Sequence, residues 1–133
     1  MDDRKRNLQG SESRDIFKRC HKQKLNRSFY AIDADLILIK KYPPEIVAYL
    51  DFKKSNDRIT FAEVIAYNEW MLFRPVYVVQ SDDSENGPFD ILKYKGGDYK
   101  PNPPIVDLEL IEKNLDWIGL QKWEGQLRNG VNS

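Results

Sequence analysis

The chain has one cysteine, one histidine and no long apolar run among its 133 residues. The single cysteine, Cys20, excludes an internal disulfide framework and a zinc cage built from cysteines, and it suits a reducing compartment. A membrane-spanning helix needs about 18 to 20 consecutive apolar residues, and no segment of the sequence supplies them. The N-terminus is charged rather than apolar, unlike a secretory signal. We therefore expect a cytoplasmic protein with no membrane partner.

An excess of one charge is also lacking, because the formal net charge is zero. The distribution is uneven, however. Nine Lys or Arg and four Asp or Glu lie between Met1 and Arg27, whereas the remainder carries twelve and seventeen. Residues 1–10 also lack apolar periodicity, so we expect a flexible basic arm there and a single domain over residues 11–133, whose acidic body could hold cations. The basic residues expected to contact nucleic-acid phosphates are Lys18, Arg19, Lys22, Lys24 and Arg27. A merely solvated tail is the alternative.

Apolar spacing predicts the first elements. Ile16, Phe17 and Cys20 fit one face of a short helix. The stretch SFYAIDADLILIKK reads as a strand, and KYPPE turns the chain because its two prolines remove two backbone donors. A second strand follows from Ile46 to Lys53. We expect these two strands to form an antiparallel hairpin.

The second half of the chain predicts a crossover. Thr60 and Glu63 form a capping box at the start of TFAEVIAYNEWMLF, whose apolar positions follow helical spacing. PVYVVQ then reads as a buried strand parallel to the second strand. FDILKY predicts a further strand, KGGDYKPNPP a loop, and residues 105–128 one or two helices. The expected packing residues of that tail are Trp117, Leu120 and Trp123. The fold class is α/β, with a mixed central sheet flanked by helices.

An acid and a lysine interrupt the apolar stretch AYLDFKK. Asp51 and Lys53 share one face of the second strand because side chains alternate along a strand. The hairpin can bring Asp35 of the first strand beside them if the turn sets that register. Carboxylate oxygens suit Mg²⁺ or Mn²⁺, and such an ion next to an ammonium group can offset charge on a phosphate. This combination points to phosphodiester hydrolysis.

The same residues carry a family resemblance. DADLILI, then AYLDFKK, then a helix and PVYVV resemble the PD-(D/E)xK nuclease superfamily, which includes restriction-endonuclease-like and Holliday-junction-resolving enzymes. The resemblance covers about residues 28 to 94. It implies a restriction-endonuclease-like fold, with Asp35, Asp51 and the backbone carbonyl of Phe52 as metal ligands and Lys53 assisting catalysis. It also implies DNA as the substrate, with RNA not excluded, and a homodimer.

The sequence departs from the family pattern at Ala34, where the superfamily carries the proline of its name. Asp33 shares a face with Asp35, so either could be the principal ligand; Asp35 is preferred because the apolar strand begins directly after it. Many members place a further acid on the first helix, for which Glu12 is the best match.

Each of these residues also has a purely structural explanation. Asp51 and Lys53 could form a surface ion pair, which contributes less than about 1 kcal/mol. The capping box explains Glu63, and Tyr67 reads as a core residue. A nuclease fold that binds nucleic acid or protein without turnover is the main alternative function, and the acidic body could instead bind a basic protein.

Overall fold

The computed structural model describes residues 12–20 and 35–130. They fall into two units, one within Met1–Ala31 and one within Ile32–Ser133. In the first unit residues 12–20 are helical, as the apolar spacing predicted, and Ile16 and Phe17 are exposed. The prediction of a flexible arm over residues 1–10 lies outside the described residues, so the boundary with a domain over 11–133 stays a prediction.

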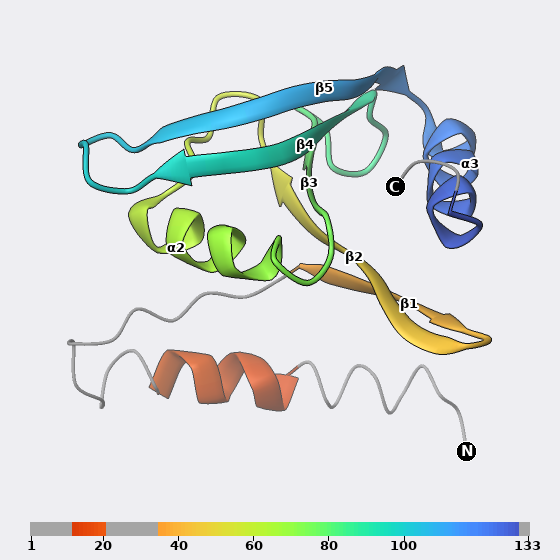
Figure 1. Cartoon of the computed structure of the whole chain (residues 1–133), viewed down its shortest axis with the longest axis horizontal. Coiled ribbons are helices and arrows are strands. Elements are labelled where there is room, and N and C mark those ends of the chain that lie inside the picture. The colour runs from red at the N-terminus through yellow and green to blue at the C-terminus, as the bar shows by residue number, and fades with distance from the viewer. Residues whose placement is uncertain (1–11, 21–34, 131–133) are drawn as a thin grey trace. The chain divides into compact units, whose positions relative to one another are not determined.

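The second unit is a five-stranded mixed sheet with two helices (Figure 1). Strands and helices follow in the order β1 (Leu36–Lys41), β2 (Pro44–Lys53), α2 (Phe61–Trp70), β3 (Val76–Gln80), β4 (Phe89–Asp98), β5 (Ile105–Leu115) and α3 (Trp117–Arg128). The strands lie side by side in chain order. β2 and β3 are parallel, and the other neighbours are antiparallel. The predicted hairpin and the predicted crossover through α2 are thereby confirmed.

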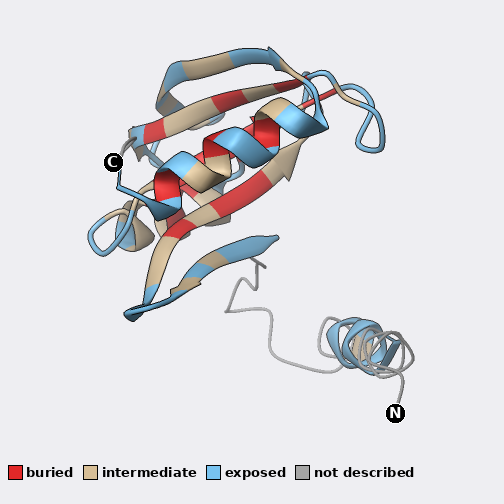
Figure 2. Cartoon of the chain, turned by 90° about the vertical axis from the view of Figure 1, so that its right-hand side faces the viewer, coloured by how far each residue is buried: buried red, intermediate tan, exposed pale blue. Residues whose placement is uncertain are grey.

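The two helices cover opposite faces of the sheet. Strand side chains on one face of the sheet, among them Leu50 and Tyr77, pack with Trp123 of α3. Side chains on the other face, among them Val78, pack with Tyr67 of α2. Because successive strand side chains point to opposite faces, β2, β3, β4 and β5 contribute to both clusters, whereas β1 contributes Leu38 to the α3 cluster alone. Figure 2 shows the buried residues gathered on the inner strands and on the inner side of α2, while β1 is largely exposed.

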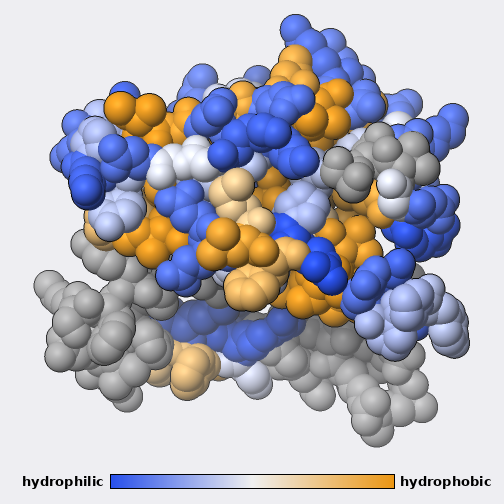
Figure 3. Space-filling view, viewed as in Figure 1, coloured by the Kyte–Doolittle hydropathy of each residue, from blue (hydrophilic) through white to orange (hydrophobic). Residues whose placement is uncertain are grey.

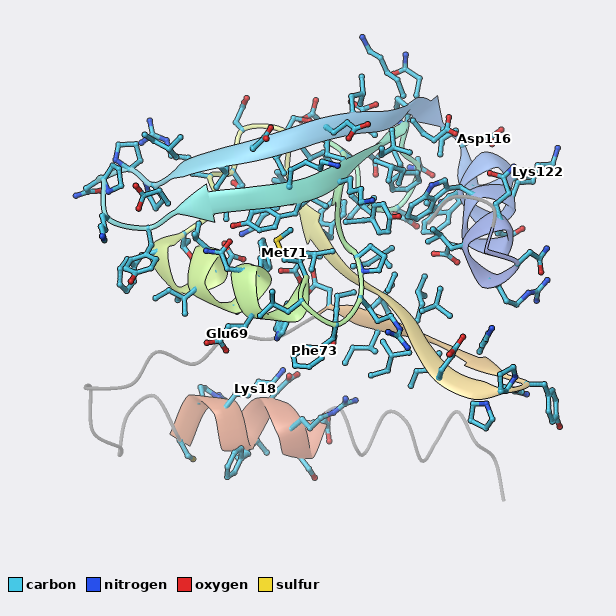
Figure 4. The ribbon with its side chains drawn as sticks, in the orientation of Figure 1. Lys18, Glu69, Met71, Phe73, Asp116 and Lys122 are labelled. Carbon is cyan, nitrogen blue, oxygen red and sulfur yellow. The ribbon has the colours of Figure 1, made fainter. Side chains whose placement is uncertain are left out.

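The start of α2 follows from its sequence. The Thr60 side chain accepts a hydrogen bond from the Glu63 amide, and Glu63 bonds back to the Thr60 amide, as the capping box predicted. At the other end of the helix, Met71 packs toward the sheet, whereas Glu69 and Phe73 point away from it (Figure 4).

The loop predicted over KGGDYKPNPP is wrong in its first part, because β4 continues to Asp98. Gly97 pairs with Val106 of β5. The Asn68 side chain bonds to both backbone groups of Gly97 and accepts from the Tyr94 hydroxyl. A Cβ at Gly97 would lie 2.6 Å from that hydroxyl oxygen. The glycine therefore permits close packing within a strand rather than marking a loop.

The helix predicted over the first half of residues 105–128 is also wrong, since residues 105–115 form β5. Val106 and Leu108 alternate toward the α2 face, and the ladder with β4 pairs the backbone groups along one side of β5. The second half is helical as expected, and Leu120 and Trp123 are buried. Trp117 is instead half exposed, with its ring against Phe89.

Candidate active site

β2 supplies two of the expected site residues. Ala48 and Leu50 lie in the cluster under α3. Asp51 and Lys53 are at the alternate positions of the strand, so their side chains point to the opposite face of the sheet. Both polar side chains contact residues of α2 through hydrogen bonds. The acid and the lysine that interrupt an apolar strand therefore share the face that α2 covers.

A β-bulge in the hairpin brings Asp35 to Asp51. Ile39 pairs with Ile46, but Leu38 pairs with Ala48, so Val47 is an extra residue on β2. Beyond the bulge Leu36 opposes Leu50, which sets Asp35 opposite Asp51. Without the extra residue the register would differ by one, and Asp35 would fall on the other face. The predicted proximity of these two acids is thus a consequence of this bulge.

The Asp51 carboxylate is almost fully buried, with 4% of the residue exposed. One oxygen, Oδ1, accepts the amide of Asp35 at 3.0 Å, and the other accepts the Tyr67 hydroxyl. Burial raises the pKa of Asp51 above its usual value, the two hydrogen bonds partly oppose that rise, and the charges of Asp35 and Glu63 add to it. An ionised Asp51 therefore lies in a region short of positive charge.

The Asp35 carboxylate is held at the open end of β1. Its Oδ2 accepts the Phe52 amide at 2.7 Å, while the residue itself is exposed. The N–H and C=O of one strand residue point to the same side of the strand. The Phe52 N–H bonds to Asp35, so the Phe52 carbonyl also faces the β1 side of β2, where Asp35 lies. The carbonyl of the next residue, Lys53, points to the opposite side, toward β3, and accepts the Ser81 amide.

Lys53 is held by α2 rather than by Asp51. Its Nζ lies 2.6 Å from Oε1 of Glu63, and each side chain is only 14% exposed. The same Glu63 oxygen accepts the Thr60 amide at 2.9 Å. Burial acts to raise the pKa of Glu63, but the bonds from Lys53 and Thr60 outweigh burial and lower it below its usual value. Glu63, which takes part in the capping box of α2, thus also holds the side chain of Lys53 in place.

Tyr67 and Glu63 are the contacts that sequence reasoning missed. The sequence predicts Tyr67 as a core residue, and it is fully buried, but its hydroxyl also bonds to Asp51. Burial raises the pKa of Tyr67, so the phenol stays protonated and donates. Their spacing of four residues, which puts both polar tips on one face of α2, was the signal in the sequence.

The donor set fits a hard divalent cation. Asp35, Asp51 and the Phe52 carbonyl present oxygen atoms at one edge, and Mg²⁺ is commonly held by one or two carboxylates with water completing the shell. Burial is the main cause of the raised pKa of Asp51, and a cation there would offset the smaller rise caused by the neighbouring Asp35 carboxylate. No cluster of three or more His, Cys, Asp or Glu suited to a metal occurs in the described residues. The fit is therefore to a water-rich site with two carboxylates.

The structure does not test the other residues predicted for the site. Glu12, Lys18 and Arg19 lie on the helix of the first unit and are exposed. The rest lie outside the described residues; they are Lys22, Lys24, Arg27 and Asp33. Their roles stay predictions.

No family model, no curated protein and no solved structure matches the chain. Within the described ranges, no helix is long and apolar enough to cross a membrane.

Proposed function

We propose that this protein is a metal-dependent nuclease that hydrolyses phosphodiester bonds in DNA. The observation that carries the proposal is the pairing of Asp35 with Asp51 beside Lys53, with the Asp35 side chain held by β2 and those of Asp51 and Lys53 held by α2. A hairpin, a helical crossover and a parallel strand surround these residues. That order supports a restriction-endonuclease-like fold and the resemblance to the PD-(D/E)xK superfamily.

Asp35, Asp51 and the Phe52 carbonyl would hold Mg²⁺ or Mn²⁺. Such an ion, when bound, offsets charge on the phosphate and lowers the pKa of a bound water. Asp51 contributes a carboxylate whose orientation is fixed by Tyr67 on one oxygen and by the Asp35 amide on the other. Hydrogen bonds of this kind orient a carboxylate ligand for a metal ion.

Lys53 supplies the second part of the proposed chemistry. Its ammonium group lies two residues from Asp51 on the same face, and Glu63 limits its motion. A positioned ammonium stabilises the negative charge that develops on a phosphate oxygen as water attacks, or it orients that water. The acids would thus hold the cation, and the lysine would act on the phosphate.

A second candidate is a nuclease fold that binds nucleic acid without cleaving it. Two observations favour it: Lys53 is engaged by Glu63, and both oxygens of Asp51 already accept hydrogen bonds. In an inactive relative these contacts would be purely structural. Cleavage assays separate the two candidates.

The direct test incubates the purified protein with labelled linear, nicked and four-way DNA, and with RNA, in Mg²⁺, Mn²⁺ or EDTA. We expect DNA cleavage with either metal and none with EDTA. Asp51→Asn should abolish it, whereas Asp107→Asn, which removes an exposed carboxylate of β5, should not. Binding without cleavage in all metals would favour the second candidate.

A paired substitution addresses the first-strand acid. If Asp35 is the ligand, Asp35→Asn abolishes cleavage and Asp33→Asn only weakens it. The reverse ranking would move the metal site to Asp33.

A further inference from the structure

Three adjoining hollows lie where the β1–β2 turn meets the end of α3. Their volumes are about 300, 270 and 510 Å³, and Lys40 and Arg128 line all three. The largest is lined by Ile39, Lys40, Lys41, Tyr42, Arg128 and Asn129. Figure 3 shows hydrophilic surface at this turn, at the lower right of the view. None of the candidate site residues lines these hollows.

Positive charge at this end contrasts with the rest of the unit. Positions 35–130 carry twelve Lys or Arg and sixteen Asp or Glu. Lys40 is paired with Glu45 at 2.7 Å, but Lys41 and Arg128 form no ion pair with any residue that the structure describes. Both are exposed and line the same hollow. Two uncompensated cations therefore face one cavity on an otherwise acidic body.

Tyr42 adds an aromatic surface to these cations. It is 90% exposed and lines the same hollow. Packing does not explain a ring left so open. Exposed aromatic rings beside a basic groove are the means by which proteins bind single-stranded nucleic acid, because every base can stack on a ring while cations contact the phosphates.

The hollow is linked to the candidate active site through β1. Asp35 precedes the first residue of β1, and Lys41 is its last. Six residues at about 3.3 Å each separate them by about 20 Å along the strand. About six stacked nucleotides, at about 3.4 Å each, span that distance.

From this arrangement we infer that the hollow is a binding subsite for single-stranded nucleic acid, which would also be the substrate class of the nuclease. Tyr42 stacks on a base, and Lys41 and Arg128 contact the flanking phosphates. The inference rests on the proposed function for its link to cleavage, but binding at the hollow requires no metal.

The test measures the affinity of the full chain for a labelled 12-nucleotide DNA strand by fluorescence anisotropy in EDTA. Tyr42→Ala should weaken binding about tenfold, within the range measured for loss of one base stack. Tyr42→Trp should retain the affinity. The matched control is Tyr99→Ala, which removes an exposed tyrosine between β4 and β5 and should leave the affinity unchanged. Equal affinities for Tyr42→Ala and the wild type would overturn the subsite.

Salt dependence tests the phosphate contacts. Replacing both Lys41 and Arg128 by Gln should lower the slope of log affinity against log salt by about 1.4, since each contact with a single strand contributes about 0.7. Lys122→Gln is the control, because Lys122 lies on α3 as Arg128 does but points away from the sheet (Figure 4). An unchanged slope in the double variant would contradict the phosphate contacts.

A 12-base-pair duplex completes the test. We expect Tyr42→Ala to change duplex affinity less than twofold, because paired bases are not free to stack on the ring. An equal loss with duplex would overturn the preference for single strands. All these measurements are made without metal. They therefore test the binding subsite even if the protein does not cleave DNA.

Discussion

The two faces of β2 carry opposite kinds of side chain. Toward α3 it presents Ala48 and Leu50, which pack with Trp123 in an apolar cluster. Toward α2 it presents Asp51 and Lys53, which bond to Tyr67 and Glu63. Burial stabilises the fold on the first face, whereas on the second it raises the pKa of Asp51 and so disfavours the ionised carboxylate. The side of β2 that faces α3 therefore stabilises the fold, whereas the side that faces α2 lowers stability and carries the candidate site.

The largest expected effect is on the α3 face. Trp123→Ala should lower the free energy of unfolding by about 3–5 kcal/mol, because it removes a ring that is 2% exposed. Denaturant unfolding measures this. Trp117→Ala is the matched control: Trp117 is 49% exposed, so we expect a clearly smaller loss. Equal losses would show that the α3 cluster is not the main source of stability.

The next effect concerns the phenol that holds Asp51. Tyr67→Phe removes a donor to a buried carboxylate and should cost about 2 kcal/mol. That bond lowers the pKa of Asp51, so its loss raises the pKa further, and metal binding should need a higher pH.

Tyr94→Phe provides the control for Tyr67→Phe, because it removes a buried hydroxyl that bonds to Asn68, away from Asp51. It should lower stability without shifting the pH dependence of metal binding. Titrations of Mn²⁺ at several pH values measure both variants. The same pH dependence in the two would contradict the role of Tyr67.

A smaller effect separates the two functions of Glu63. Glu63→Gln keeps a capping residue of the accepted type but removes the charge that pairs with Lys53, and it should cost about 1 kcal/mol near neutral pH. The pKa of Glu63 lies below its usual value of 4.5, so its charge stabilises the fold above that value.

This contribution of Glu63 is lost as the pH falls through the lowered pKa. The difference in stability between the wild type and Glu63→Gln should therefore be constant above about pH 4.5 and shrink below it. Unfolding curves at a series of pH values measure the difference. A difference that grows on acidification would contradict the assigned ion pair.

The last effect is of similar size and has the opposite sign. Asp51→Asn should stabilise the fold by about 1 kcal/mol near neutral pH while abolishing metal binding, as substitutions of costly functional residues can do. The pKa of Asp51 is raised above 3.8, so the wild type loses stability as the pH rises from that value through the raised pKa. The advantage of the variant should grow over this interval and then level off. A less stable variant at every pH would contradict the cost of burying this charge.

The sequence predicted the elements that local rules control. The capping box set the start of α2, Pro43 marked the hairpin turn, and alternation put Asp51 and Lys53 on one face, although Pro44, also expected in the turn, is the first residue of β2. These features depend on neighbours within a few residues, which is why they could be predicted.

Features that depend on distant pairing were missed. The local spacing of residues 105–115 predicts a helix, because the ladder of β5 with β4 is not visible in local spacing. The bulge at Val47 and the bond from Tyr67 to Asp51 depend on how separate segments meet. The proximity of Asp35 and Asp51 was expected only as one outcome of the register, and only the bulge selects it.

The measurement that tests the account most directly is a calorimetric titration of Mg²⁺ into the wild type, Asp51→Asn and Lys53→Ala. If Asp51 holds the cation and Lys53 acts on the phosphate, the wild type binds Mg²⁺, Asp51→Asn does not, and Lys53→Ala binds with an affinity within about threefold of the wild type while losing cleavage. Absence of binding by the wild type, or an equal loss in both variants, would contradict the account.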